Sequence, residues 1–281
     1  MKCAVFPGQG NQYIGMGKDI YSLDIVKKMY DVASEVSGID IKKISFEGPS
    51  ELQRETLNTQ LLTYVNSCAL FELIPENFNV FAGHSIGEYA ALFATGVFSF
   101  EDGVRIVKKR GELMSSLSFD EPSLVAVLGV DRKCVEDFCK NDTNNELEVA
   151  LCNSPGNYVV GGLPENIKKY KLPGKVKPLA VSGPFHTSLF KPVAEEFQKY
   201  LQEFEFKDPQ SVVYSNATGL PYYKGEIDKG LASQLYKPVL WQDIIEAIPA
   251  DRFVEIGPGN SLAKMINKIR KDANVVSIQN V

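Results

Sequence analysis

The pentapeptide GHSIG at residues 83–87 restricts the fold of this chain more than any other part of its sequence. A short apolar run at residues 80–82 precedes it, and an alanine-rich helical segment begins near Glu88. The pattern G-x-S-x-G between a strand and a helix is typical of a sharp turn that leaves the serine hydroxyl exposed, because small glycines let the backbone pass close by. The sequence therefore predicts an α/β fold with Ser85 as candidate nucleophile, and the alternative is a chance glycine-rich turn.

A nucleophilic serine needs a base, and the sequence contains two histidines, His84 and His186. His84 comes directly before Ser85, and adjacent side chains near a strand end point in roughly opposite directions, so we expect His84 to be packed instead of catalytic. His186 lies in SGPFHTS, which we expect to be a loop where two domains meet, a common place for a site. His186 is therefore the candidate base, and a hydrogen-bonded structural histidine is the alternative.

Strand and helix patterns alternate along both ends of the chain. Short apolar, β-prone runs predict strands, and apolar residues at helical spacing predict helices. Such alternation indicates a mainly parallel sheet covered by helices. The expected strands are residues 3–6, 80–82, 212–214 and 253–256, and the expected helices are residues 25–36, 59–73, 102–115 and 191–206.

The middle of the chain has a different order of elements. It reads strand, helix, strand, strand, helix, strand, which is the order of a ferredoxin-like split βαβ unit. We therefore expect a small ferredoxin-like domain at residues 123–183, inserted into a large α/β domain made of residues 1–122 and 184–281. Its expected elements are residues 124–130, 133–140, 148–152, 158–161, 165–170 and 176–181.

Composition excludes several classes of protein. The net charge is −5, whereas a non-specific nucleic-acid binder is usually strongly basic. The 5 cysteines are odd in number and lack CxxC spacing, so we expect neither a disulfide framework nor a zinc site. No apolar run approaches the ~20 residues of a membrane span. The apolar stretch in MKCAVFPGQG is too short for a signal peptide, so we expect a cytoplasmic protein.

One basic residue stands out in the segment VKKRGELM. Lys108 and Lys109 are expected on a solvated helix face. Arg110 is followed directly by Gly111. Arginine is suited to bidentate capture of a carboxylate, so Arg110 is a candidate for binding an acidic ligand.

Eight segments of the chain resemble, in order, motifs of the malonyl-CoA:acyl carrier protein transacylases. The match runs from Phe6 to about Lys268. The resemblance implies an α/β-hydrolase-like domain with a ferredoxin-like insert. It also implies an acyltransferase that moves malonyl from malonyl-CoA to the phosphopantetheine thiol of acyl carrier protein, through a malonyl-serine, for fatty acid synthesis and without a cofactor. The segments are FPGQGNQYIGMG, GHSIGEYAAL, RIVKKRGELM, CNSPGNYVVGG, SGPFHTS, SNATG, QLYKPVLW and EIGPGNSL.

The resemblance also assigns roles to individual residues. It implies Ser85 as nucleophile, His186 as general base, and the backbone carbonyl of Gln234 as the group that orients the histidine. Arg110 corresponds to the arginine that pairs with the malonyl carboxylate. The remaining matches are the oxyanion-hole amides of Gln9 and Ile86, the site-wall residues Gln60 and Asn153, and Phe185.

Two expectations about substrate choice follow from these assignments. Acetyl-CoA should leave a partly buried Arg110 unpaired, at a cost on the order of 3–5 kcal/mol. Phe185, beside His186, should crowd an α-methyl branch and disfavour methylmalonyl groups. The sequence departs from the usual family pattern at Leu61, where proline is common, and at Pro184, where alanine is common. The first departure concerns the conformation of a local loop and not the chemistry.

Other functions fit parts of the same pattern. A serine esterase or thioesterase would use GHSIG and His186, but it has no need of Arg110 and normally has an acidic third member. The same transferase chemistry could serve a polyketide synthase or a malonate decarboxylase, and an inactive scaffold is the non-enzyme alternative. We expect a monomer. Two basic clusters are candidates for docking an acidic carrier: Lys168, Lys169, Lys171, Lys175 and Lys177, and Lys264, Lys268, Arg270 and Lys271.

Overall fold

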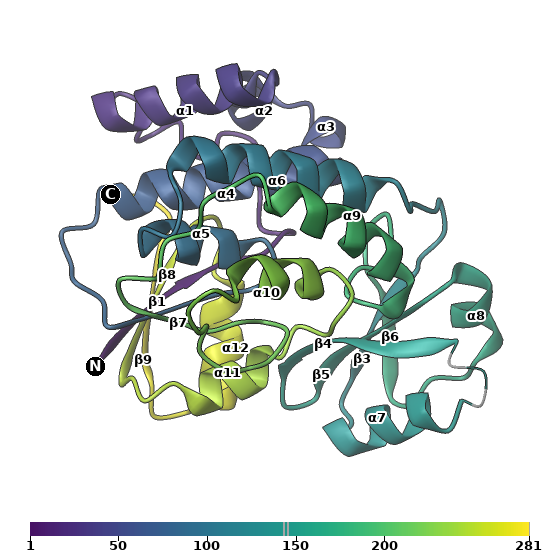
Figure 1. The fold of residues 1–281 in the computed structure, drawn as a ribbon. Coiled ribbons are helices and arrows are strands. Elements are labelled where there is room, and N and C mark those ends of the chain that lie inside the picture. Colours follow the sequence, from purple (N-terminus) through teal and green to yellow (C-terminus); the bar gives the residue numbers. More distant parts are fainter. Residues whose placement is uncertain (143, 145, 281) are drawn as a thin grey trace.

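The computed structural model describes residues 1–142, 144 and 146–280, and two separate β-sheets organise these residues (Figure 1). The larger sheet has the strand order β7-β2-β1-β8-β9, and each neighbouring pair is parallel. It is the mainly parallel sheet that the sequence predicts. Its strands are β1 (Lys2–Phe6), β2 (Val80–Gly83), β7 (Val212–Val213), β8 (Arg252–Ile256) and β9 (Asn274–Ile278).

Strand β1 lies at the centre of this sheet and is buried on both faces. Ala4 and Phe6 pack into one hydrophobic cluster, while Cys3 and Val5 pack into a second. Alternate residues of a strand point to opposite faces, so both faces of the sheet must be covered by helices. A continuous apolar run such as CAVF is what this environment requires.

The helices divide between the two faces of the large sheet. The cluster on one face includes residues of α1, α4, α5 and α6, and the cluster on the other includes Trp241, Ile244 and Leu262 of α11 and α12. Among the described residues no helix is both long and apolar enough to cross a membrane. The helices outside the insert are α1 (Asp24–Ser37), α2 (Ile41–Glu47), α3 (Ser50–Arg54), α4 (Thr56–Glu72), α5 (Gly87–Ala94), α6 (Phe100–Ser115), α9 (Lys191–Leu201), α10 (Ile227–Gln234), α11 (Trp241–Ala247) and α12 (Ser261–Ile269).

The smaller sheet is antiparallel, with the order β4-β5-β3-β6. Helix α7 joins its first two strands and α8 its last two, so the insert has the ferredoxin-like order that the sequence predicts. We propose residues 123–183 as the limits of a small domain. Its elements are β3 (Leu124–Leu128), α7 (Arg132–Lys140), β4 (Leu147–Ser154), β5 (Asn157–Gly162), α8 (Pro164–Lys169) and β6 (Lys175–Pro178).

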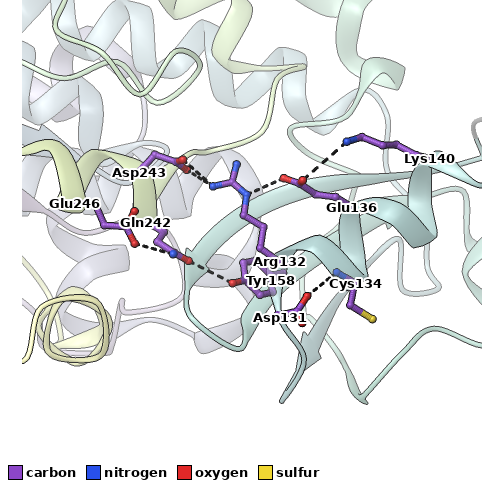
Figure 2. Close-up of polar contacts among 9 residues, drawn as sticks. All are labelled: Asp131, Arg132, Cys134, Glu136, Lys140, Tyr158, Gln242, Asp243 and Glu246. Carbon is purple, nitrogen blue, oxygen red and sulfur yellow. Dashed lines mark hydrogen bonds and ion pairs between the residues drawn. The ribbon is translucent and has the colours of Figure 1, made fainter.

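Helix α11 and the residues before it hold the small sheet against the large part of the molecule. The amide of Cys152 in β4 donates to the carbonyl of Val239 over 2.9 Å. Figure 2 shows the charged part of this junction, where Arg132 Nη1 of α7 donates to both carboxylate oxygens of Asp243 over 2.7 and 2.8 Å. These contacts fix the end of β4, which carries Asn153, next to the turn that carries Ser85.

The structure differs from the sequence prediction at the C-terminal end. The helix predicted at 191–206 stops at Leu201, because Phe204 and Phe206 alternate with acidic residues and pack their rings on the core from a non-helical segment. The short helices α2, α3, α10, α11 and α12 were not predicted. Strand β9 was not predicted either, since it is a half-exposed edge strand without a long apolar run.

Candidate active site

Ser85 occupies a tight turn between β2 and α5, and glycines on both sides make the turn possible. Its φ is +52°, in the left-handed region that non-glycine residues rarely adopt. A Cβ atom on Gly83 would lie 2.0 Å from the carbonyl carbon of Gly87, and one on Gly87 would lie 2.1 Å from the Phe6 carbonyl oxygen. Larger side chains would therefore separate helix α5 from the strands. Backbone strain of this kind, roughly 1–3 kcal/mol, is often found at functional sites.

His186 reaches Ser85 from the loop between the small sheet and α9. Ser85 Oγ lies 2.9 Å from His186 Nε2. His186 Nδ1 lies 2.7 Å from the backbone carbonyl oxygen of Gln234, so Nδ1 must carry a proton and donate it to that carbonyl. This leaves the Nε2 lone pair free to accept the serine proton. His186 also has a positive φ of +63° and is only 3% exposed.

Arg110 extends from α6 to the same serine and is 1% exposed. Its Nη2 donates to Ser85 Oγ over 3.2 Å and to Gln234 Oε1 over 2.9 Å, and its Nη1 donates to Gln60 Oε1 over 2.6 Å. The guanidinium carbon lies 5.3 Å from the centre of the Tyr89 ring. Among the described residues Arg110 Nε has no hydrogen-bond partner.

These contacts change one expectation about Arg110. The sequence predicts that the guanidinium stays unpaired when the acyl group lacks a carboxylate. In the structure two neutral amide oxygens, from Gln60 and Gln234, already accept its protons. A carboxylate ligand at Arg110 would therefore have to replace amide oxygens, and it would form stronger charge-assisted bonds than they do.

The backbone amides of Gln9 and Ile86 are the two donors expected to form an oxyanion hole. Within the described residues, neither the Gln9 nor the Ile86 backbone N–H makes a hydrogen bond. Ile86 follows the serine and caps the N-terminus of α5, where backbone N–H groups lack helical partners. Gln9 lies in the loop after β1, the strand that pairs with β2. Free amides at this place can stabilise a developing negative charge.

Two other predicted site residues, Asn153 and Phe185, contact neighbours of the catalytic pair and not Ser85 Oγ itself. His84 Nε2 donates to Asn153 Oδ1 over 2.9 Å, and the His84 ring packs edge-on against Trp241. Asn153 thus contacts the residue before the serine and not the hydroxyl. Phe185 is 3% exposed and packs against Phe190, with ring centres 5.5 Å apart.

Sequence reasoning missed three polar groups behind the serine. Asn216 Oδ1 accepts from the Ser85 backbone N–H over 2.7 Å, and its Nδ2 donates to the Gly83 carbonyl over 2.6 Å, so one side chain ties both sides of the turn. Glu88 and Tyr222 hydrogen-bond to each other beside it. Asn216 and Glu88 stand in segments already singled out, SNATG and GHSIGE, but spacing alone does not reveal contacts between distant parts of a chain.

Known proteins match this chain over nearly its whole length. A family model described as acyl transferase domain matches residues 4–280. The malonyl CoA-acyl carrier protein transacylase of Staphylococcus aureus (strain MRSA252) is 38% identical, over 98% of this chain and 94% of the relative. This agreement confirms the resemblance read from the sequence motifs.

Solved structures extend the agreement to the fold. An acyl carrier protein S-malonyltransferase from Vibrio cholerae superposes with a TM-score of 0.93 at 32% identity, covering 100% of this chain and 97% of that one. A malonyl-transacylase solved in complex with a type II PKS acyl-carrier protein gives a TM-score of 0.93 at 30% identity, covering 100% and 96%. The predicted α/β fold with its inserted small domain is confirmed.

Proposed function

Because this chain belongs to the family of acyl transferase domains, we propose that Ser85 carries a malonyl group from malonyl-CoA to acyl carrier protein. The transfer supplies malonyl units for fatty acid synthesis. The observation that carries the proposal is a buried arginine whose Nη2 lies 3.2 Å from the hydroxyl of a serine bonded to a histidine. A hydrolase of neutral esters has no use for that cation. The oxygen that accepts from His186 Nδ1 is a backbone carbonyl, whereas esterases normally supply a carboxylate there.

Loading begins when the thioester carbonyl of malonyl-CoA lies against the amides of Gln9 and Ile86. His186 Nε2 takes the proton of Ser85 Oγ, which attacks the carbonyl carbon. The tetrahedral intermediate places its negative oxygen on the two amides. The C–S bond then breaks, and the imidazolium returns its proton to the coenzyme A sulfur. The product is a malonyl-serine ester and a free thiol.

Transfer reverses these steps with a different thiol. The phosphopantetheine thiol of acyl carrier protein gives its proton to His186 and attacks the ester carbonyl, and Ser85 Oγ leaves and regains the proton. Both thioesters are of similar energy, so the exchange needs no nucleotide to drive it. Since Ser85 is only 9% exposed and His186 only 3%, bulk water has little access to the ester.

Substrate choice rests on Arg110. We propose that the malonyl carboxylate replaces the amide oxygens of Gln60 and Gln234 at Nη1 and Nη2. Phe185 lies beside the base and would crowd an α-methyl branch, so methylmalonyl-CoA should load Ser85 more slowly than malonyl-CoA. Equal loading by the two thioesters would exclude that role for Phe185.

Replacing Arg110 by glutamine should slow malonyl loading by about 10²–10³-fold, because a buried malonyl carboxylate without its cation costs roughly 3–5 kcal/mol. Loading by acetyl-CoA should change by less than tenfold. Stopped reactions with each thioester, read by intact-protein mass spectrometry, measure both rates. Arg105→Gln is the matched control, because Arg105 lies on the same helix, half-exposed, and pairs only with Asp102 among the described residues. Equal losses with both thioesters would contradict the assignment.

The pH dependence of loading follows from the environment of His186. Burial, with the nearby charge of Arg110, lowers the pKa of His186 to about 3. The neutral imidazole that acts as base is therefore already present at pH 5. The loading rate should not fall between pH 8 and pH 5, whereas a base with the ordinary pKa of 6.5 would lose roughly thirtyfold over that range. Rates in buffers of constant ionic strength test this, and a thirtyfold fall would exclude the low pKa.

The proposed partner is an acidic acyl carrier protein, so its docking surface should be locally basic. In the first cluster Lys168 and Lys169 are already paired, with Glu121 and Glu146. Lys175 and Lys177 lie on β6, a strand at the edge of the small sheet whose residues are all exposed. These two lysines remain the stronger candidates in that cluster. We also propose a monomeric enzyme that acts in the cytoplasm.

Intact-protein mass spectrometry tests the proposed function directly. Brief incubation with malonyl-CoA should give a malonyl adduct on the protein, and addition of a holo acyl carrier protein should remove it and produce malonyl-carrier. Thiol release without an adduct would indicate a hydrolase and overturn the proposal. Carriers of the fatty acid and polyketide types are compared in parallel, and discharge to the polyketide carrier alone would overturn the assignment to fatty acid synthesis.

A further inference from the structure

A fully buried carboxylate, Glu88, lies behind Ser85 and takes no part in the mechanism above. It stands on α5, three residues after the serine, and is 0% exposed. The Tyr222 hydroxyl donates to one of its oxygens. The other oxygen accepts from Gln234 Nε2 and, over 3.3 Å, from the backbone N–H of Asn216. An unpaired buried charge is costly, so this carboxylate needs a positive group nearby.

Gln234 connects Glu88 to that positive group. Its Nε2 donates to Glu88 and to the Ser85 carbonyl over 2.9 Å, while its Oε1 accepts from Arg110 Nη2 over 2.9 Å. The amide is thus held in one orientation, with its oxygen toward the cation and its nitrogen toward the anion. Both residues are buried, and the charge of each favours the charged form of the other, so Glu88 and Arg110 are buried countercharges that this amide connects.

A substrate carboxylate bound at Arg110 changes the balance between buried positive and negative charges. Within the protein, one buried cation, Arg110, is balanced by one buried anion, Glu88. With malonyl present, two carboxylates face one guanidinium, and the substrate displaces the Gln234 oxygen that Glu88 holds in place. An uncharged acyl group such as acetyl adds no second anion. The charge of Glu88 therefore acts against acidic acyl groups and not against neutral ones.

We propose that Glu88 is a positioning residue that sets specificity: through Gln234, its carboxylate competes with the substrate carboxylate for Arg110 and so limits the preference for acidic acyl groups. The inference rests on the proposed malonyl transfer. Competition of this kind also helps the malonyl group to leave, because Arg110 regains the Gln234 oxygen once the acyl group has moved to the carrier thiol.

The protonation of Glu88 makes the competition dependent on pH. Burial raises the pKa of Glu88 to about 7, while the hydrogen bonds from Tyr222, Gln234 and Asn216 and the charge of Arg110 act in the opposite direction. Tyr89, Tyr222 and His186 are further titratable groups beside this pair. Burial raises the pKa of both tyrosines and lowers that of His186, so all three stay neutral over the pH range of the test. Tyr222, which donates to Glu88, also lines a cavity of about 540 Å³ between α9 and α10.

The test is the ratio of single-turnover loading rates for malonyl-CoA and acetyl-CoA between pH 5.5 and 8.5. Ionisation of the coenzyme A phosphates and of His186 affects both thioesters alike and cancels in this ratio. In the wild type, protonation of Glu88 should raise the ratio as pH falls through about 7. In Glu88→Gln the ratio at pH 8 should be about tenfold above that of the wild type and independent of pH, since a nearby buried charge commonly alters such energies by a pKa unit or more.

Two further variants separate a charge effect from a packing effect. Glu255→Gln removes another 0% exposed carboxylate, whose partners are Leu262, Ala263 and Ser277, and it should leave the ratio unchanged. Tyr222→Phe removes a hydrogen bond that stabilises the charged form of Glu88, so the rise in the ratio should move to higher pH.

Three outcomes would overturn the inference. They are a Glu88→Gln ratio within twofold of the wild type at pH 8, an equal change in Glu255→Gln, or, if Glu88→Gln fails to fold, a Tyr222→Phe profile that does not move upward. Failure of the proposed function gives a different result, because the wild type would then form no malonyl adduct at any pH.

Discussion

Replacing Ser85 by alanine is expected to abolish the malonyl adduct and to slow release of coenzyme A by about 10⁴-fold or more. The loss is large because the variant removes the atom that forms the covalent intermediate, and the remaining groups can only assist direct attack by a weak nucleophile. His186 and the proposed oxyanion-hole amides of Gln9 and Ile86 would remain in the variant.

The fold should survive this change. Alanine lacks only the hydroxyl, Gln60 and Gln234 still accept from Arg110, and the backbone N–H of residue 85 keeps its bond to Asn216. Ser123→Ala is a matched control, because Ser123 is also buried and its hydroxyl has no partner among the described residues. A malonyl adduct that persists in Ser85→Ala would place the nucleophile elsewhere and refute the mechanism.

The sequence predicted the parts of the site that follow from local chemistry. A serine between two glycines at a strand–helix junction can be recognised without knowledge of distant residues. The structure differs from the prediction in one respect, because Ser85 is only 9% exposed once His186 and Arg110 pack against its hydroxyl. A chain with two histidines, one of them adjacent to the serine, leaves a single candidate base. The ferredoxin-like insert was predicted for a similar reason, since its strands and helices are regular and closely spaced.

The parts that the sequence did not predict depend on contacts between distant segments. Gln234 illustrates this, because the resemblance implies a role for its backbone carbonyl, while its side chain joins Arg110 to Glu88. Glu88 follows the serine motif directly but reads as an ordinary first-turn acid of a helix. Its burial depends on contacts with Asn216 and Tyr222, which lie more than 120 residues later in the sequence.

The neutral partners of Arg110 were also beyond sequence reasoning. Gln60 lies on α4 and Gln234 at the end of α10, so nothing local relates them. Their amide oxygens accept hydrogen bonds from the guanidinium, and this lowers the energetic cost of binding an acyl group that lacks a carboxylate. In the proposed mechanism, selectivity for malonyl depends on how much more strongly Arg110 binds the malonyl carboxylate than these two amide oxygens.

Replacing His186 by glycine is expected to slow loading by about 10²–10⁴-fold, the usual contribution of a general base. Glycine is the suitable substitution because residue 186 has a φ of +63°, where a glycine backbone is unstrained. The backbone N–H of residue 186 keeps its bond to the Leu235 carbonyl, so the loop retains one anchor. The variant removes the imidazole and leaves a space beside Ser85 Oγ.

That space permits a test of what the imidazole does. Free imidazole added to His186→Gly should restore part of the loading rate, because it can accept the Ser85 proton with one nitrogen and donate to the Gln234 carbonyl with the other. Mass spectrometry of the adduct at increasing imidazole concentration measures the recovery, and the same series with Ser85→Ala should show none. A purely structural histidine would give a slow variant that imidazole does not rescue. Recovery that appears only above the pKa of imidazole would further identify the neutral ring as the active species, because only the neutral ring has a lone pair that can accept the serine proton.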